Sequence, residues 1–223
     1  MTDIVMVAGG YHGGWYFEPI ADPLRAAGHR VFAPTLPGMH GDYEPGVNFS
    51  SHVDAVVELI DRECGDEVVL VGQSYGGAVI AAVEGRTRAT VAHLLYLDAV
   101  VPADGDRVWD LVDPAMTDVW IHSTLDGFLV PLPEGFLDYE PRAVPHPIAT
   151  FLEPVRLAAG AGSAPRTYVS AESGPYRAVY ERFVDDPTWT CLSVACGHDV
   201  VRELPREIEA IVRDVAEQAT VGR

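Results

Sequence analysis

The residues best suited to chemistry surround Ser74. Residues 67–77 read Glu-Val-Val-Leu-Val-Gly-Gln-Ser-Tyr-Gly-Gly, so an apolar run ends in Gly72-x-Ser74-x-Gly76 and a helix-like run follows. This context is typical of a nucleophile elbow, a tight turn that holds a serine in a strained conformation at the carboxyl end of a strand. A chance match on a surface loop is the alternative, and the flanking strand and helix disfavour it. The pattern therefore predicts Ser74 as a nucleophile.

A serine nucleophile needs a general base, and His198 is the histidine in the best position to act as one. It lies in Ala-Cys-Gly-His-Asp, directly after the last apolar run and before the C-terminal helical pattern. A loop at the carboxyl end of that strand would bring the imidazole over Ser74. We therefore predict a Ser74–His198 pair.

A glycine-rich loop, Ala-Gly-Gly-Tyr-His-Gly-Gly-Trp at residues 8–15, follows the first apolar run. Such a turn exposes backbone amides, so the amides of Gly10 and Tyr75 are predicted to form an oxyanion hole. The loop lacks the spacing of a nucleotide-binding P-loop. Its larger side chains, Tyr11, His12 and Trp15, are expected to bind substrate.

The elements that must position these residues alternate along the chain. Continuous apolar runs predict strands buried on both faces at 4–8, 30–36, 67–71, 92–97, 166–170 and 188–194. Helical patterns lie at 18–27, 52–64, 77–84, 175–184 and 205–218. Strand alternating with helix predicts an α/β fold, a doubly wound, mostly parallel six-stranded sheet with helices on both faces.

The alternation is interrupted between residues 101 and 165, which are rich in proline and aromatic residues. We interpret 1–100 and 166–223 as the core and 101–165 as an inserted lid. Ligands of open α/β sheets bind beyond the carboxyl ends of the strands, where such an insertion would form the wall of a pocket. Trp109, Trp120 and Phe128 are the expected substrate-binding residues of this lid.

The composition and charge of the chain limit the classes of molecule that it can bind. The chain has 223 residues, 48% of them hydrophobic, and a formal net charge of −18 that is spread along its length. This acidity argues against nucleic acid and membrane partners, which leaves a small-molecule substrate and, still open, a homodimer. No residue cluster shows metal-ligand spacing, so no metal or cofactor is implied. No basic leader or long apolar span is evident, so we expect a cytoplasmic protein.

Several motifs together resemble the α/β-hydrolase superfamily. They are Val-Gly-Gln-Ser-Tyr-Gly-Gly, Gly-Tyr-His-Gly-Gly-Trp, Tyr-Leu-Asp-Ala-Val-Val-Pro and Gly-His-Asp. More narrowly, the chain resembles the branch of plant methyl-ester esterases, hydroxynitrile lyases and their bacterial relatives, from about residue 4 to 215. The resemblance implies the α/β-hydrolase fold without its first two strands, with Ser74 as nucleophile and His198 as base.

Two departures from the family pattern concern the catalytic machinery. The family loop usually begins His-Gly, and here the pair is Ala8-Gly9, so a residue that braces the oxyanion turn is absent. The usual acid, an aspartate after the penultimate strand, is also absent. Glu172 could replace it, or Asp98 at the end of the preceding strand, as in hydrolase-fold lipases. Asp98 is favoured because a strand end holds a side chain more rigidly than a Ser-Gly-Pro turn.

Three functions remain open at this stage. The first is a serine hydrolase that cleaves an ester, lactone or thioester of a small apolar or aromatic molecule through an acyl-enzyme on Ser74. The second is a lyase, dehydratase or cyclase that uses the Ser–His pair as acid and base, and the third is a small-molecule receptor. Cyanohydrin cleavage is disfavoured, because Asp199 stands where the plant lyases carry a lysine. We expect Asp199 to point away from the site.

Overall fold

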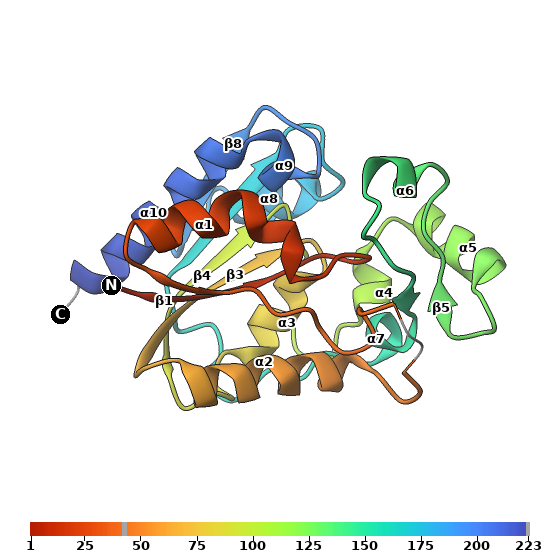
Figure 1. Cartoon of the computed structure of the whole chain (residues 1–223), viewed down its shortest axis with the longest axis horizontal. Helices are drawn as coiled ribbons and strands as arrows, with labels where there is room; N and C mark the ends of the chain where they lie inside the picture. The colour runs from red at the N-terminus through yellow and green to blue at the C-terminus, as the bar shows by residue number, and fades with distance from the viewer. Residues whose placement is uncertain (42–43, 222–223) are drawn as a thin grey trace.

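The computed structural model describes residues 1–41 and 44–221 and is built around a parallel sheet (Figure 1). The six strands of the sheet are β1 (Asp3–Val7), β2 (Arg30–Phe32), β3 (Glu67–Gln73), β4 (Thr90–Leu97), β7 (Arg166–Ala171) and β8 (Trp189–Val194). They lie in the order β2-β1-β3-β4-β7-β8, and each neighbouring pair is parallel. The predicted fold class is therefore confirmed. β2 ends at Phe32 and not at residue 36, because Pro34 has no N–H to donate to a neighbouring strand.

Consecutive strand residues pack into two separate cores, which explains why the strand sequences are apolar throughout. On β1, Val5 and Val7 belong to one core and Ile4 and Met6 to the other. Helices cover both faces: α1 (Glu18–Ala26) and α10 (Pro205–Val221) lie on one, and α2 (Phe49–Glu63) and α3 (Gly76–Val83) on the other (Figure 1). β8 is an exception to the predicted two-sided burial. As an edge strand it leaves three of its six residues exposed.

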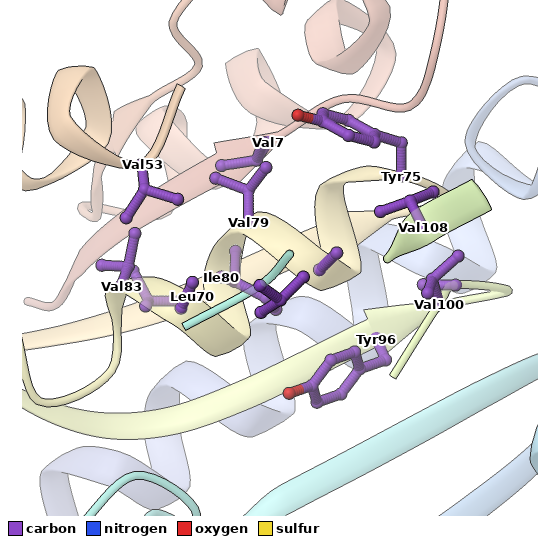
Figure 2. Close-up of a cluster of buried hydrophobic side chains, with 14 of the residues drawn as sticks. Val7, Val53, Leu70, Tyr75, Val79, Ile80, Val83, Tyr96, Val100 and Val108 are labelled. Carbon is purple, nitrogen blue, oxygen red and sulfur yellow. The ribbon is translucent and has the colours of Figure 1, made fainter. Parts of the chain in front are cut away.

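The core beneath the elbow is formed largely by branched aliphatic side chains. Figure 2 shows this cluster, with side chains of β1, β3 and β4 meeting those of α2 and α3: Val7, Leu70, Tyr96, Val53, Val79, Ile80 and Val83. All of these are almost fully buried. α2 begins three residues before its predicted start, because Asn48 and Ser51 form a capping box at its amino terminus.

Residues 101–165, which we call the inserted segment after the interpretation given above, contain short elements and lie beyond the arrowheads of β3 and β4 (Figure 1). Its elements are α4 (Val108–Leu111), α5 (Pro114–Ser123), β5 (Leu129–Val130), α6 (Phe136–Tyr139), β6 (His146–Pro147) and α7 (Ala149–Leu152). The remaining elements are η1 (Gly14–Phe17), α8 (Arg177–Phe183) and α9 (Val200–Glu203). Within the described residues, no helix is both long and apolar enough to cross a membrane.

Strand register brings the ends of β3 and β4 together. Gln73, the last residue of β3, pairs with Leu97, the last residue of β4. The residues that follow, Ser74 and Asp98, therefore leave the sheet side by side at its carboxyl edge. Both adopt positive φ angles, 52° for Ser74 and 41° for Asp98, which residues other than glycine rarely adopt. This is the edge where an α/β sheet binds its ligand.

Candidate active site

Ser74 lies in the turn between β3 and α3, where the sequence predicted it. Its φ of 52° is the strained conformation expected of an elbow serine. α3 passes so close to β1 that a Cβ on Gly76 would lie 2.1 Å from the carbonyl oxygen of Val7. Glycine is therefore required at residue 76 for the turn to form.

His198 reaches Ser74 from the loop between β8 and α9. Its Nε2 lies 3.0 Å from Ser74 Oγ, and its Nδ1 lies 2.7 Å from Asp98 Oδ2. Because a carboxylate only accepts hydrogen bonds, Nδ1 carries the proton in the neutral ring. Nε2 is then free to accept the proton of the Ser74 hydroxyl.

Asp98 is fully buried, and the end of β7 fixes its orientation. The backbone amide of Ala171 donates to Asp98 Oδ1 at 3.2 Å. The turn after β7 then packs against the carboxylate, so closely that a Cβ on Gly174 would lie 2.2 Å from Asp98 Oδ2. On the other side, the Tyr168 hydroxyl bonds both the amide and the carbonyl of Ala99, at 3.1 and 3.0 Å. The Ala171 amide and the Gly174 turn therefore fix the carboxylate, and Tyr168 fixes the backbone that follows it.

Glu172, the alternative acid, is not brought to His198. Its side chain is exposed, and its backbone amide donates to the Val194 carbonyl at 2.9 Å. Its strand neighbour Ala171 and the nearby Gly174 contact Asp98 instead. The turn that carries this alternative acid thus supports Asp98, which follows another strand.

Gln73 is a site residue that the sequence reasoning missed. Its Nε2 donates to the His198 carbonyl at 3.2 Å and lies 3.4 Å from His198 Nε2. Its position directly before Ser74 in the elbow motif was the available signal.

The amides expected to form an oxyanion hole lie on either side of Ser74. Gly10 and Tyr75 both line the cavity above the serine, and within the described residues neither amide donates to a protein acceptor. The glycine-rich loop approaches so closely that a Cβ on Gly9 would lie 2.8 Å from Ser74 Cβ. The loop and the elbow thus each offer one amide, that of Gly10 and that of Tyr75, without a protein acceptor among the described residues.

The inserted segment contacts the glycine-rich loop through backbone and histidine hydrogen bonds. The Val144 amide donates to the Tyr11 carbonyl at 3.0 Å, and the Tyr11 amide donates to His146 Nδ1 at 3.4 Å. His146 is buried, which holds its pKa well below the ordinary value and keeps its ring neutral. Its Nε2 then donates to Thr150 Oγ1 at 2.8 Å. The loop is therefore held from the opposite side of the site.

A cavity of about 280 Å³ opens onto Ser74 and His198. Of the side chains predicted to bind substrate, Tyr11, His12 and Trp120 line it. The other three do not. Trp15 stacks under the Arg142 guanidinium at 4.4 Å, Trp109 lies behind Trp120 at 5.7 Å between ring centroids, and Phe128 is 54% exposed.

Further lining residues come mostly from the inserted segment and were not predicted individually. They are Tyr16, Val108, Val112, Met116, Pro133, Phe136, Tyr139, Phe151, Pro175, Tyr176 and Asp199. Most are apolar, so the cavity suits an apolar molecule. Asp199 contradicts our expectation that it points away, since it lines the wall and accepts the Tyr139 hydroxyl at 2.5 Å. Neighbours in sequence gave no signal for this contact, because Tyr139 belongs to the inserted segment.

Comparisons with known proteins agree with this geometry. The model of the alpha/beta hydrolase family matches residues 4–221. The carbendazim hydrolyzing esterase of Nocardioides sp. (strain SG-4G) is 34% identical over 236 residues, which cover 93% of this chain and 97% of that protein. The alpha-hydroxynitrile lyase of Arabidopsis thaliana is 33% identical over 103 residues, 44% of this chain and 40% of that protein.

Structural similarity covers nearly the whole chain. The extracellular alpha/beta-hydrolase from Paenibacillus species superimposes with a TM-score of 0.80 at 18% identity, covering 97% of this chain and 99% of that one. The resemblance to plant esterases, hydroxynitrile lyases and bacterial relatives is thereby confirmed. The chain belongs to the alpha/beta hydrolase family and is an enzyme related to carboxylic ester hydrolases.

Proposed function

We propose that this enzyme is a serine esterase that cleaves esters of small apolar or aromatic molecules, with Ser74, His198 and Asp98 as its catalytic triad. One observation carries the proposal: a continuous hydrogen-bonded path from Ser74 Oγ through His198 to the buried Asp98, opening onto an apolar cavity. The esterase relative that matches nearly the full length of the chain supports the same reaction.

In the first half of the proposed reaction, Ser74 Oγ attacks the ester carbonyl carbon and its proton passes to His198 Nε2. Asp98 stabilises the resulting imidazolium through Nδ1. The amides of Gly10 and Tyr75 donate to the oxyanion of the tetrahedral intermediate. Collapse of that intermediate expels the alcohol, whose oxygen takes the proton from Nε2, and leaves an acyl group on Ser74.

In the second half, water repeats the attack on the acyl-enzyme. His198 takes a proton from the water, the tetrahedral intermediate forms again, and the Ser74 oxygen leaves with the proton. The product acid then carries one oxygen from water. Lactones and thioesters present the same carbonyl and fit the same scheme, and an apolar acyl chain would contact the aromatic wall of the cavity.

The test begins with intact mass after exposure to a fluorophosphonate. Wild type should gain a single adduct, Ser74→Ala none, and the exposed-serine control Ser163→Ala the wild-type adduct. Hydrolysis of short-chain phenyl esters and of carbendazim is then compared between wild type and Ser74→Ala, with a loss of about a thousandfold or more expected.

Isotope labelling separates hydrolysis from acid–base chemistry without an acyl-enzyme. Reaction in ¹⁸O-labelled water should place one label in the product carboxylate. Turnover without the label, or activity that persists in Ser74→Ala, would contradict the proposal and favour a lyase or cyclase.

A further inference from the structure

One corner of the cavity is polar, although most of its wall is apolar. His12, Tyr16 and Asp199, which we call the polar corner, all line the cavity. The rings of His12 and Tyr16 lie 4.9 Å apart between centroids. Asp199 influences both neighbours. Burial raises the pKa of Tyr16, and the charge of Asp199 raises it further. Burial lowers the pKa of His12, and the charge of Asp199 partly offsets that effect. The three side chains therefore form one cluster.

Two atoms of the polar corner are buried without a hydrogen-bond partner in the described structure. They are the hydroxyl oxygen of Tyr16, a residue that is 7% exposed, and Oδ1 of Asp199. The Tyr16 hydroxyl lies near the Asp199 side chain and the Val201 backbone, which both influence its pKa, but neither contact has the geometry of a hydrogen bond. A buried polar atom without a partner costs free energy, so native proteins seldom keep one unless a ligand or water satisfies it. Both atoms belong to residues that line the cavity, which is where a substrate would supply the missing partner.

The chemistry of the polar corner calls for a hydrogen-bond donor. A carboxylate oxygen only accepts hydrogen bonds. His12 Nδ1 lies 2.7 Å from the Gly10 carbonyl and must donate to it, and burial favours the neutral ring, so Nε2 is a second acceptor. Tyr16 can donate or accept. An amino group, which brings two N–H donors, matches two acceptors better than a hydroxyl, which brings one.

The position of Asp199 indicates which part of the substrate this group belongs to. The leaving oxygen of an ester must lie near His198 Nε2, because that atom returns the proton to it. Asp199 follows His198 directly in the chain, whereas the apolar wall is formed largely by the inserted segment. His198 also acts electrostatically on His12, so we place the polar corner beside the space of the leaving alcohol.

We propose that the polar corner is a specificity subsite that binds an amino group on the alcohol portion of the substrate, with Asp199 Oδ1 and His12 Nε2 as acceptors and the Tyr16 hydroxyl as a further partner. This inference rests on the proposed esterase function and narrows its substrate class. The same carboxylate would repel an alcohol portion that carries a carboxylate, because two like charges would share a buried site.

The test compares two esters with one acyl group, 4-aminophenyl butyrate and 4-methylphenyl butyrate. Their alcohols are similar in size and in leaving-group basicity, so the ratio of their kcat/KM values reports the amino contact. Wild type should prefer the amino ester by about tenfold or more, as expected for one buried hydrogen bond to a charged group. A ratio near one would overturn the subsite and would mean that Tyr16 and Asp199 satisfy one another.

Two variants assign the preference to residues. Asp199→Leu, similar in size, should reduce the ratio to about one, and Tyr16→Phe should reduce it about threefold. Because Asp199 adjoins His198, Asp199→Leu can lower kcat/KM for both esters. The ratio of the two kcat/KM values cancels this shared loss. The exposed carboxylate control Asp118→Asn should keep the wild-type ratio. An unchanged ratio in both corner variants would overturn the proposal.

A binding measurement distinguishes failure of the subsite from failure of the esterase function. Calorimetric titration of wild type with 4-aminophenol and 4-methylphenol needs no turnover. Tighter binding of 4-aminophenol that is lost in Asp199→Leu supports the subsite even if neither ester is hydrolysed. Equal binding, or binding of neither phenol, overturns it. Hydrolysis of both esters at equal rates would leave the esterase proposal standing and remove the subsite alone.

Discussion

Asp98 Oδ2 lies 2.7 Å from His198 Nδ1, although a whole strand separates the strands that carry them. Asp98 follows β4, His198 follows β8, and β7 runs between the two. The contact forms because the end of β7 supports the carboxylate: the Ala171 amide binds Asp98 Oδ1, and Gly174 leaves room for Oδ2. β7 therefore positions the acid without supplying it.

The first prediction concerns the identity of this acid. Asp98→Asn should lower kcat by about 10³- to 10⁴-fold, because the amide no longer holds His198 in the required tautomer. Glu172→Gln is the matched control and should keep activity within about twofold, since its side chain is exposed away from the ring. The measurement is steady-state hydrolysis of a phenyl ester. The assignment fails if the two variants lose activity equally.

A second prediction concerns Gly174. Gly174→Ala places a methyl group 2.2 Å from Asp98 Oδ2, so the carboxylate or the turn must shift. We expect kcat to fall at least about tenfold and stability by about 1–3 kcal/mol. In Gly65→Ala the nearest atom would lie at an ordinary 3.7 Å, so this control should keep wild-type activity. Wild-type rates in Gly174→Ala would show that the turn does not constrain the acid.

A third prediction tests strain at the nucleophile. The φ of 52° at Ser74 is costly for any residue with a Cβ and nearly free for glycine. Ser74→Gly should therefore be more stable than Ser74→Ala by about 0.5–1 kcal/mol, after the extra chain entropy of unfolded glycine is subtracted. Urea unfolding of the two inactive variants measures the difference. Equal stabilities would mean that the elbow stores no strain.

A fourth prediction follows from the buried histidines behind the site. His52 Nε2 donates to the Pro37 carbonyl at 2.9 Å, and its Nδ1 accepts the Tyr75 hydroxyl at 2.8 Å. Burial lowers the pKa of His52 to about 4 and also lowers that of His146. Below pH 6.5 the unfolded chain binds protons that the folded chain does not, so stability should fall with pH from about 6.5 to 4. His52 alone accounts for about 3 kcal/mol of that loss.

The measurement is urea unfolding at several pH values across this range. His52→Gln should flatten the dependence, because the amide can replace both hydrogen bonds without titrating. His122→Gln, at an exposed position, should leave the curve unchanged. An identical pH dependence in wild type and His52→Gln would contradict the assignment.

Local sequence identified the fold and two residues of the proposed triad. The apolar runs were continuous because each central strand is buried on both faces, and this pattern is legible without a structure. Ser74 was recognisable because the strained turn needs Gly76, and His198 because it follows the last strand. These features depend on neighbours within a few residues.

Sequence favoured Asp98 over Glu172 only through the rigidity of a strand end, because the contact itself depends on how β7 supports the end of β4. The sequence also could not predict which side chains line the cavity. Trp120 lines it and Trp109 lies behind Trp120, although both belong to one aromatic segment. Asp199 was expected to point away, and a tyrosine 60 residues distant holds it in the wall. Sequence determined which elements form and which residues can react. Tertiary packing decided which of them meet, because contacts between distant segments depend on register and shape, which no short pattern encodes.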